Sequence, residues 1–332
     1  MIEYALNYED VVLTPNQSIL RSRTQADVST IFGGRIFSLP IVPANMTCCI
    51  NADWACWFSN HDFFYIMHRF NGKNNLKDLR WFIERANKEN WRTISISIGI
   101  HEKDRTLLEW AINNKHRIDF LTIDIAHGHC TPMKEMLEYI HRIYDGRNDP
   151  PFPAKPIIIA GNVGTADAVL DLEKWGADVT KIGLAYGRAC ITKSKTGFAT
   201  PMFSTVMECA RYAKKPLIAD GAIRENGDIA KSLVAGATMV MAGSLFAACE
   251  DSPAEGAITD FGELTHKFYY GSASYENGNQ SNIEGTSIAL ECNGLLYKDK
   301  LDEIKQDLQS ACSYAGGSNL KAFDSVRWQV IK

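Results

Sequence analysis

A cysteine within a basic, glycine-containing segment is the strongest candidate for a nucleophile in this chain. The segment KIGLAYGRACITKSKTGF covers residues 181–198 and contains Cys190. Arg188, Lys193 and Lys195 lie near this cysteine in the sequence, and their positive charge would favour its thiolate form. A thiolate is a good nucleophile, so Cys190 could bond covalently to a substrate. A small buried cysteine beside a basic surface loop would give the same pattern, so both interpretations stay open here.

Two consecutive later segments could hold a phosphorylated sugar. Asp220 ends an apolar run and is followed by Gly221. A carboxylate in this position can accept two hydrogen bonds from a ribose diol. Gly243 and Ser244 end the next apolar run and could present backbone amides and a hydroxyl to a phosphate. Ordinary loop contacts are the alternative for either segment alone, and the two together favour a phosphate site.

A third polar segment is TIDIAHGHC, residues 122–130, with Asp124, His127 and His129. The two histidines could suggest a metal, but no carboxylate or cysteine set with zinc spacing completes a site. A polar contact with a substrate or cofactor is therefore the favoured interpretation, and a structural loop contact is the simpler alternative.

A fourth candidate is the carboxylate of Glu284, which lies beside Gly285 in NIEGTS, residues 282–287. With FYYGSAS (268–274), this stretch could fold over a site, where a carboxyl group could deliver or accept a proton. From the residues alone, an exposed acid is the simpler explanation.

Eight short apolar runs must position these residues. Most are rich in Val and Ile and apolar on both faces, which is typical of strands buried in a parallel sheet. Amphipathic helices are expected between them, for example over 168–177 and 228–237. The expected strands cover 37–44, 63–68, 92–99, 119–126, 155–161, 177–183, 215–220 and 237–243.

This alternation predicts an α/β fold, a closed (β/α)8 TIM barrel, with an open doubly wound sheet as the alternative. Polar residues at the carboxyl ends of the strands favour the barrel, because that end is its catalytic face. No linker divides the chain, so residues 1–332 are predicted to be one domain, with a polar, irregular, mobile flap over about 252–288. The polar residues at strand ends are Asn45, His68, Asp124, Asn162, Asp220 and Ser244.

Composition narrows the class of protein. Of 332 residues, 45% are hydrophobic and 22% charged, as in soluble globular proteins, and the net charge of −4 does not suggest a face for nucleic acid. The sequence contains no apolar stretch of about 18 residues, which argues against a membrane span. The first residues do not resemble a targeting peptide. The nine cysteines form no CxxC pair, so reduced thiols in a cytoplasmic protein are expected.

Together these segments resemble the IMP dehydrogenase/GMP reductase family, and the resemblance runs along nearly the whole chain. A set of motifs in the same order is highly specific, and it favours Cys190 as the nucleophile. The matching segments are NYEDVVLTPNQS (7–18), LPIVPANM (39–46), FFYIMHRF (63–70), TIDIAHGH (122–129), IAGNVGTADAV (159–169), CITKSKTGF (190–198), IADGAIRENGDIAKS (218–232), GATMVMAGSLFA (236–247), YGSAS (270–274) and DLQSACSYAGG (307–317).

Within this family the chain is most similar to the short bacterial GMP reductases. The CBS modules that IMP dehydrogenases usually insert after the second strand are absent, and so is their flap Arg-Tyr pair, whereas IEG (283–285) resembles the reductase segment. The resemblance implies NADPH-dependent reductive deamination of GMP to IMP and ammonia, through a thioimidate on Cys190. A reductase of another 2-aminopurine nucleotide such as dGMP, an IMP dehydrogenase without CBS modules and a non-catalytic nucleotide-binding relative remain alternatives.

The resemblance also implies roles for individual residues. Cys190 would attack the purine, and Thr192 and Glu284 would relay protons. No Gly-x-Gly-x-x-Gly motif follows a strand, so barrel loops would hold the nicotinamide. A homotetramer and a monovalent cation, K⁺, are expected as well. The implied substrate-binding residues are Asn45, Gly187, Arg188, Asp220, Gly221, Gly243, Ser244, Tyr270, Gly271, Ser272 and Gly285; the cofactor-side residues are His68, Asp124, Ala126, Gly161 and Asn162; and the cation would be held by backbone carbonyls of Gly183 and Ala185.

The chain departs from the family pattern at three places. It has Ala185-Tyr186-Gly187 where the family usually has Gly-Pro-Gly, Ala222 where a second glycine follows the aspartate, and Thr286 where a lysine is common. These changes leave the implied catalytic residues intact. They bear on the phosphate or cation site, and so on which nucleotide is preferred.

Overall fold

Seven parallel strands form the central sheet of the computed structural model, which describes residues 5–70, 75–145, 153–259, 262–277 and 281–331. Their spatial order is β4–β10–β9–β8–β7–β6–β5, so the first and last strands in the sequence are neighbours and the sheet curls round. The strands are β4 (Ile41–Pro43), β5 (Ser95–Ile98), β6 (Phe120–Asp124), β7 (Ile157–Val163), β8 (Val179–Ile182), β9 (Leu217–Asp220) and β10 (Met239–Ala242).

The remaining barrel position is held by Met67. This residue makes an isolated parallel bridge with Ile96 of β5, and its backbone bonds Ser95 and Ser97. The strand expected over 63–68 is therefore shortened to a single bridge, although Phe64 and Ile66 still point into the barrel with the other inward residues. The (β/α)8 barrel predicted from the sequence is confirmed.

Side chains alternate between two apolar layers along each strand. In β6, Phe120 belongs to the cluster inside the barrel, whereas Leu121 and Ile123 pack outward against the helices. Val179 and Ile218 face inward in the same way. Strands buried on both faces read as continuous apolar runs, which explains the sequence pattern.

Helices surround the barrel, and their caps fix where they begin. Thr165 caps α5 by accepting a hydrogen bond from Ala168 N, and Asp228 accepts bonds from Arg224 N and Glu225 N before α8. Both helices therefore begin two residues earlier than the apolar pattern indicated. The helices are α1 (Ala52–Asn60), α2 (Asn75–Lys88), α3 (Glu102–Asn113), α4 (Thr131–Asp145), α5 (Ala166–Lys174), α6 (Thr192–Thr196), α7 (Met202–Tyr212), α8 (Asn226–Val234), α9 (Ser244–Ala247) and α10 (Tyr297–Ala315).

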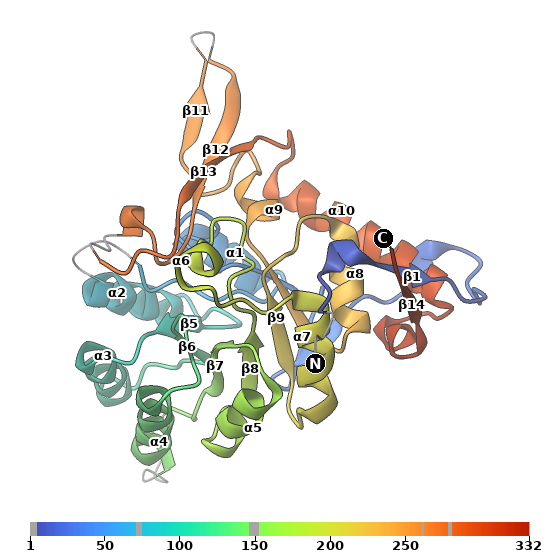
Figure 1. Cartoon of the computed structure of the whole chain (residues 1–332). Helices are drawn as coiled ribbons and strands as arrows, with labels where there is room; N and C mark the ends of the chain where they lie inside the picture. Colours follow the sequence, from blue (N-terminus) through green and yellow to red (C-terminus); the bar gives the residue numbers. More distant parts are fainter. Residues whose placement is uncertain (1–4, 71–74, 146–152, 260–261, 278–280, 332) are drawn as a thin grey trace.

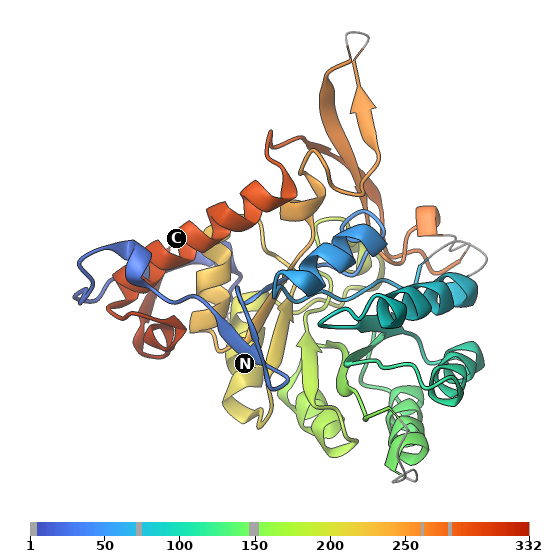
Figure 2. The ribbon, with the colours of Figure 1, turned by 180° about the vertical axis from the view of Figure 1, so that it is seen from behind.

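A hairpin of β2 (Thr30–Phe32) and β3 (Arg35–Phe37) closes the amino-terminal end of the barrel. Phe32 and Phe37 both lie against Phe64 and Phe120. The two ends of the described chain also meet, because β1 (Val11–Thr14) pairs antiparallel with β14 (Arg327–Val330) (Figure 1), whereas the β2–β3 hairpin is seen from behind, at the front of Figure 2. Short 3-10 helices are η1 (Tyr8–Asp10), η2 (Arg23–Gln25), η4 (Tyr275–Asn277) and η5 (Leu320–Ser325).

The flap region contains a three-stranded antiparallel sheet, so the expectation of an irregular segment is corrected. It consists of β11 (Gly256–Ile258), β12 (Leu264–Tyr270) and β13 (Ser287–Glu291), and it rises from the barrel as an arm (Figure 1). Lys267 and Tyr269 are buried on one face of β12 while His266 and Phe268 are exposed on the other. This alternation was hidden because buried Lys267 makes the inward face look polar; its ammonium group donates to the carbonyls of Ser252 and Ala254. None of the helices in the described part of the chain is long and apolar enough to cross a membrane.

Candidate active site

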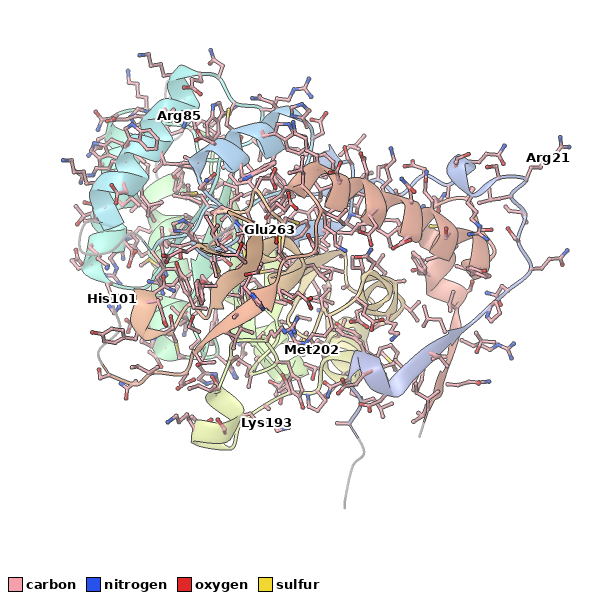
Figure 3. All side chains as sticks on the ribbon, turned by 90° about the horizontal axis from the view of Figure 1, so that it is seen from above. Arg21, Arg85, His101, Lys193, Met202 and Glu263 are labelled. Carbon is pink, nitrogen blue, oxygen red and sulfur yellow. The ribbon has the colours of Figure 1, made fainter. Side chains whose placement is uncertain are left out.

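A cavity of about 400 Å³ opens at the carboxyl ends of the barrel strands. It is lined by residues from the strand ends, from the loop that carries Cys190 and from the flap. Viewed from above, Lys193 on α6 and His101 at the start of α3 lie on different sides of this end of the barrel, and Glu263, near the tip of the arm, lies near the centre of the view (Figure 3).

Three groups from two distant parts of the chain form a continuous hydrogen-bonded relay on the cavity wall. The Cys190 thiol donates to Thr192 Oγ1 at 3.2 Å, and the Thr192 hydroxyl donates to Glu284 Oε2 at 2.7 Å. All three residues line the cavity and are partly buried. A nucleophile, a hydroxyl and a carboxylate in this order can exchange a proton with a group bound at the sulfur.

The backbone of the flap holds this relay together. Ile191 N donates to Glu284 O and Thr286 N donates to Ala189 O, both at 2.8 Å, so that Cys190 and Gly285 form an antiparallel bridge. A Cβ atom on Gly285 would lie only 3.0 Å from Ser274 N, and therefore only glycine fits without a shift. The flap thus covers the cysteine loop by direct backbone pairing.

A buried ammonium group joins two carboxylates deeper in the cavity. Lys181 Nζ lies 2.6 Å from Asp220 Oδ2 and 3.0 Å from Asp124 Oδ1, and its side chain is 3% exposed. Asn162 Nδ2 donates to Asp220 Oδ2 at 2.9 Å, and Asn45 Nδ2 donates to Asp124 Oδ2 at 3.0 Å. These residues lie at the ends of different strands and all line the cavity.

The charges of this cluster determine its protonation. Burial alone would raise the pKa of Asp124, but the positive charges of Lys181 and Arg69 outweigh it and hold this pKa below its usual value. Burial would likewise lower the pKa of Lys181, but Asp124 and Asp220 raise it above the ordinary lysine value. The ammonium group therefore stays charged, as does the Asp124 carboxylate, at neutral pH.

Two arginines lie at another part of the cavity, near Gly221 and Ser244. Arg188 is exposed, and Arg224 Nη2 donates to the carbonyl of Tyr186 at 3.3 Å. The pKa of Arg224 is lowered by burial and then by the like charge of Arg188. Two guanidinium groups that line the same cavity are suited to an anionic ligand such as a phosphate.

Two of the three departures from the family pattern fall in the same region. Ala185 and Ala222 both have positive φ angles, 66° and 60°, where glycine is the least strained residue. Tyr186 connects the two loops, because its carbonyl accepts from Ala222 N at 2.9 Å, and its ring lies under Lys193, whose Nζ is 5.5 Å from the ring centroid. Lys193 therefore faces Tyr186, although the sequence suggested that it would serve Cys190.

Most of the residues predicted from the sequence meet at the cavity. His68, Gly161 and Tyr270 do not line it. His68 is buried with 4% exposure, and burial lowers its pKa to about 4, while Tyr270 accepts a hydrogen bond from Thr47 instead. The predicted residues that do line the cavity are Asn45, Asp124, Ala126, Asn162, Gly183, Ala185, Gly187, Arg188, Cys190, Thr192, Asp220, Gly221, Gly243, Ser244, Gly271, Ser272, Glu284 and Gly285.

Sequence reasoning missed several residues of the cavity, chiefly Lys181, Arg69, Arg224 and Tyr269. Lys181 had a readable signal, because it is two residues after inward-facing Val179 and so shares its face of the strand. Tyr269 had none, since the flap was not recognised as strands. Its hydroxyl lies where a Cβ on Gly243 would be placed.

No group of metal-ligating side chains exists in the described part of the chain. His127 is exposed, and His129 Nε2 lies 2.9 Å from Asp171 Oδ2. Each of the nine cysteines is a free thiol in the structure, as expected for reduced thiols.

Comparison with known proteins adds the family to this geometry. The model of the IMP dehydrogenase / GMP reductase domain matches residues 5–331. The chain belongs to the IMP dehydrogenase/GMP reductase family. The match includes the barrel, the relay and the flap, and the resemblance noted in the sequence is thereby confirmed.

Curated relatives in this family are similar along nearly the whole chain. A GMP reductase of Staphylococcus epidermidis and one of Helicobacter pylori are each 44% identical, over 98% of this chain and 96% of their own length. A GMP reductase of Mesoplasma florum is 43% identical over 99% of this chain and 98% of its own length. Each of these relatives is matched over a length that includes the flap and the cysteine loop.

Proposed function

We propose that this chain reduces GMP to IMP and ammonia with NADPH, using Cys190 as the nucleophile. The observation that carries the proposal is the relay from Cys190 through Thr192 to Glu284 on the wall of a nucleotide-sized cavity. The similarity to relatives named GMP reductase, at 43–44% identity, supports the same reaction.

The first step is addition of sulfur to the purine. The Cys190 thiolate attacks C2 of guanine, and the 2-amino group then leaves as ammonia, which leaves a thioimidate between Sγ and C2. Nitrogen leaves only after it has gained a proton. Thr192 is in contact with both the sulfur and Glu284, so it can pass that proton from the carboxyl group to the departing amine.

The nucleotide is expected to lie across the barrel mouth with its ribose at Asp220. Asp220 Oδ2 is taken by Lys181 and Asn162, whereas Oδ1 has no hydrogen bond to a described residue and can accept one from a ribose hydroxyl. The phosphate is expected beside Gly221, Gly243 and Ser244, with the guanidinium groups of Arg188 and Arg224 nearby. This orientation directs the base towards Cys190.

The family implies a nicotinamide cofactor, and we propose NADPH. When bound, it supplies the hydride that C2 receives before the thiolate leaves. The part of the cavity lined by Asp124, Ala126 and Arg69 fits such a group, because Arg69 Nε is buried without a hydrogen-bond partner among the described residues. Asp124 is held ionised there and could orient an amide or a ribose.

The resemblance to the family also leads us to propose a monovalent cation at the backbone of Gly183 and Ala185. The carbonyl of Gly183 accepts a hydrogen bond from Asn162 Nδ2 at 2.8 Å, which leaves mainly Ala185 as a free backbone ligand of the proposed pair. Comparing initial rates in potassium, sodium and choline salts at equal ionic strength tests whether the chain uses K⁺.

We also propose a cytoplasmic homotetramer. The projecting arm, with Ile258 66% exposed and Phe268 38% exposed, offers apolar surface that contact between subunits would cover. Light scattering after size-exclusion chromatography gives the molar mass directly. A monomer at micromolar concentration would contradict the assembly and leave the reaction untouched.

A substrate comparison tests the proposed reaction against its alternatives. Initial rates with NADPH would be measured for GMP, deoxy-GMP and another 2-aminopurine nucleotide, and with NAD⁺ for IMP. We expect GMP to give the highest kcat/KM. A higher value for another nucleotide would overturn GMP as the substrate, oxidation of IMP alone would indicate a dehydrogenase, and nucleotide binding without turnover would indicate a non-catalytic relative.

A further inference from the structure

We propose that Lys181 is a positioning residue that couples the ribose-binding carboxylate of Asp220 to the cofactor-side carboxylate of Asp124. The proposal rests on the proposed function for the identity of the two ligands. Lys181 belongs neither to the relay nor to the segments that resemble the family motifs. Its contacts explain how the ribose side and the cofactor side of the site keep a fixed position relative to each other.

The position of Lys181 in the barrel allows it to contact both carboxylates. It lies on β8, between β7 and β9 in the sheet, and its side chain is directed into the barrel rather than towards solvent. Its ammonium group reaches Asp220 on the adjacent strand and Asp124 on β6, which is two strands away in the other direction. A single buried cation therefore spans four neighbouring strands at the base of the cavity.

The hydrogen bonds in this cluster divide the oxygens of the two carboxylates. Asp124 uses Oδ1 for Lys181 and Oδ2 for Asn45, so both of its oxygens have partners. Asp220 directs Oδ2 towards Lys181 and Asn162, and within the described part of the chain Oδ1 makes no hydrogen bond, so it can accept one from a ligand. Lys181 thus fixes which edge of Asp220 is presented to a nucleotide.

The positive charge of Lys181 couples the protonation of Asp124 to that of Asp220. Without Lys181, two carboxylates would face one buried space, and one of them would take up a proton. The other charged group near Asp124 is Arg69, whose Nη2 donates to the Asp124 carbonyl at 3.2 Å. The phenol of Tyr269 and the thiol of Cys49 also lie in the field of Asp220, and burial keeps the pKa of each well above its usual value, so neither supplies a countercharge.

The test is a double-variant cycle read by nucleotide binding. Lys181→Met keeps the length of the side chain and removes its charge. Its Kd for GMP, measured by isothermal titration calorimetry without cofactor, is expected to rise about tenfold or more, because a buried pair has lost one partner. Asp124→Asn alone is expected to leave the Kd within about threefold of wild type, since Lys181 still pairs with Asp220.

The double variant Lys181→Met/Asp124→Asn separates coupling from mere packing. Removing the second carboxylate removes the repulsion, and Asn162 still holds Asp220, so the Kd is expected to return to within about threefold of Asp124→Asn. A purely structural role for Lys181 would lower the melting temperature and the affinity equally in both backgrounds. A loss of tenfold or more in the Asp124→Asn background would overturn the proposal, even if Lys181→Met alone failed to fold.

The two proposals can fail separately. Wild-type protein that binds GMP but does not oxidise NADPH would remove the reductase proposal and leave the binding cycle readable. Wild-type protein that reduces GMP while Lys181→Met binds it with unchanged affinity would overturn the coupling alone.

Discussion

At the scale of residues, the proposed chemistry depends on three side chains, of which two are close in the sequence and the third is distant. Cys190 and Thr192 lie on one loop and Glu284 lies on the flap, yet their hydrogen bonds are 3.2 and 2.7 Å long. Because each group needs the next to move a proton, the effects of their variants should be interdependent.

Removing the sulfur should abolish turnover and spare binding. Cys190→Ala deletes the nucleophile, and the rate of NADPH oxidation is expected to fall by about 10³-fold or more. The Kd for GMP should stay within about threefold of wild type, because Asp220 and the phosphate-side residues are unchanged. Calorimetry and a rate assay on the same preparation give both numbers. Substantial remaining activity would exclude a covalent mechanism.

Replacing the acid of the relay should slow deamination selectively. Glu284→Gln keeps the shape of the side chain but cannot donate the proton in the same way, and a fall in kcat of about 10²-fold or more is expected. Since Glu284 is placed by its backbone as well, GMP binding should change little. Ammonia release during steady state is the measurement. A large loss of affinity with unchanged kcat would contradict this role.

His68 should make stability depend on pH. Burial lowers its pKa to about 4, below the unfolded value near 6.5, so the unfolded chain binds the proton more readily. The stability that neutral His68 supports is complete above pH 6.5 and is lost between about pH 6.5 and 4, by about 1.4 kcal/mol per pH unit. His68→Gln should flatten the pH dependence of the free energy of unfolding over that range. Parallel curves for the two proteins would refute the assignment.

Sequence reasoning located the polar residues at the strand ends well, since strand periodicity alone fixes which face they occupy. Asp124, Asn162 and Asp220 all line the cavity as predicted. Lys181 was missed because a single lysine within an apolar strand gives no sign of a role in the site. Its burial is explained only by its contacts with two carboxylates. No local pattern could have predicted that partner set.

At the scale of elements, the flap determines whether the relay is complete. Its strands β12 and β13 pair over five residue positions, and the segment after η4 then pairs with the cysteine loop. Gly285 is the residue of this segment that bridges Cys190. The position of this segment therefore controls the distance from Thr192 to Glu284.

A single methyl group at that point should disturb catalysis more than folding. In Gly285→Ala, the new Cβ would lie within about 3 Å of the backbone at Ser274 and Gly271, and the flap segment must shift. A fall in kcat of about tenfold or more is expected, with a small change in melting temperature. Gly227→Ala is the control, since nothing lies within 4 Å of its Cβ position and it does not line the cavity. Equal rates for the two variants would contradict this role of the flap.

The hairpin at the opposite end of the barrel should matter for stability alone. Gly33 and Gly34 both have positive φ angles, but a Cβ on Gly33 would overlap the Phe120 ring while Gly34 faces open space. Gly34→Ala should cost about 1 kcal/mol of unfolding free energy, and Gly33→Ala about 1–3 kcal/mol more. Urea unfolding of the two variants measures the difference. Equal midpoints would mean that the hairpin does not pack against the barrel interior as described.

The elements could be predicted where their periodicity is simple. In place of the strand expected over 63–68, the structure has a single bridge at Met67. The flap strands were not predicted because Lys267 lies on their buried face, where its ammonium group donates to two backbone carbonyls. Both differences come from tertiary contacts that a local pattern does not contain. Alternation of helix and strand was enough to give the barrel itself.

At the scale of the molecule, the barrel gathers at one end what the sequence distributes along its length. Strand ends supply the carboxylate–ammonium cluster, the loop after β8 supplies the proposed nucleophile, and the segment between α9 and α10 supplies the proposed acid. The opposite end is sealed by the aromatic side chains of the β2–β3 hairpin and of the barrel interior. Stability and chemistry are thereby assigned to different ends of the same barrel.

The most direct test of the account is the ratio of ammonia released to NADPH oxidised with GMP as substrate, in wild type and Cys190→Ala. We expect one ammonia released per NADPH oxidised in the wild type, and neither ammonia release nor NADPH oxidation in the variant. NADPH oxidation without ammonia, or turnover that survives the loss of the sulfur, would contradict reductive deamination through Cys190.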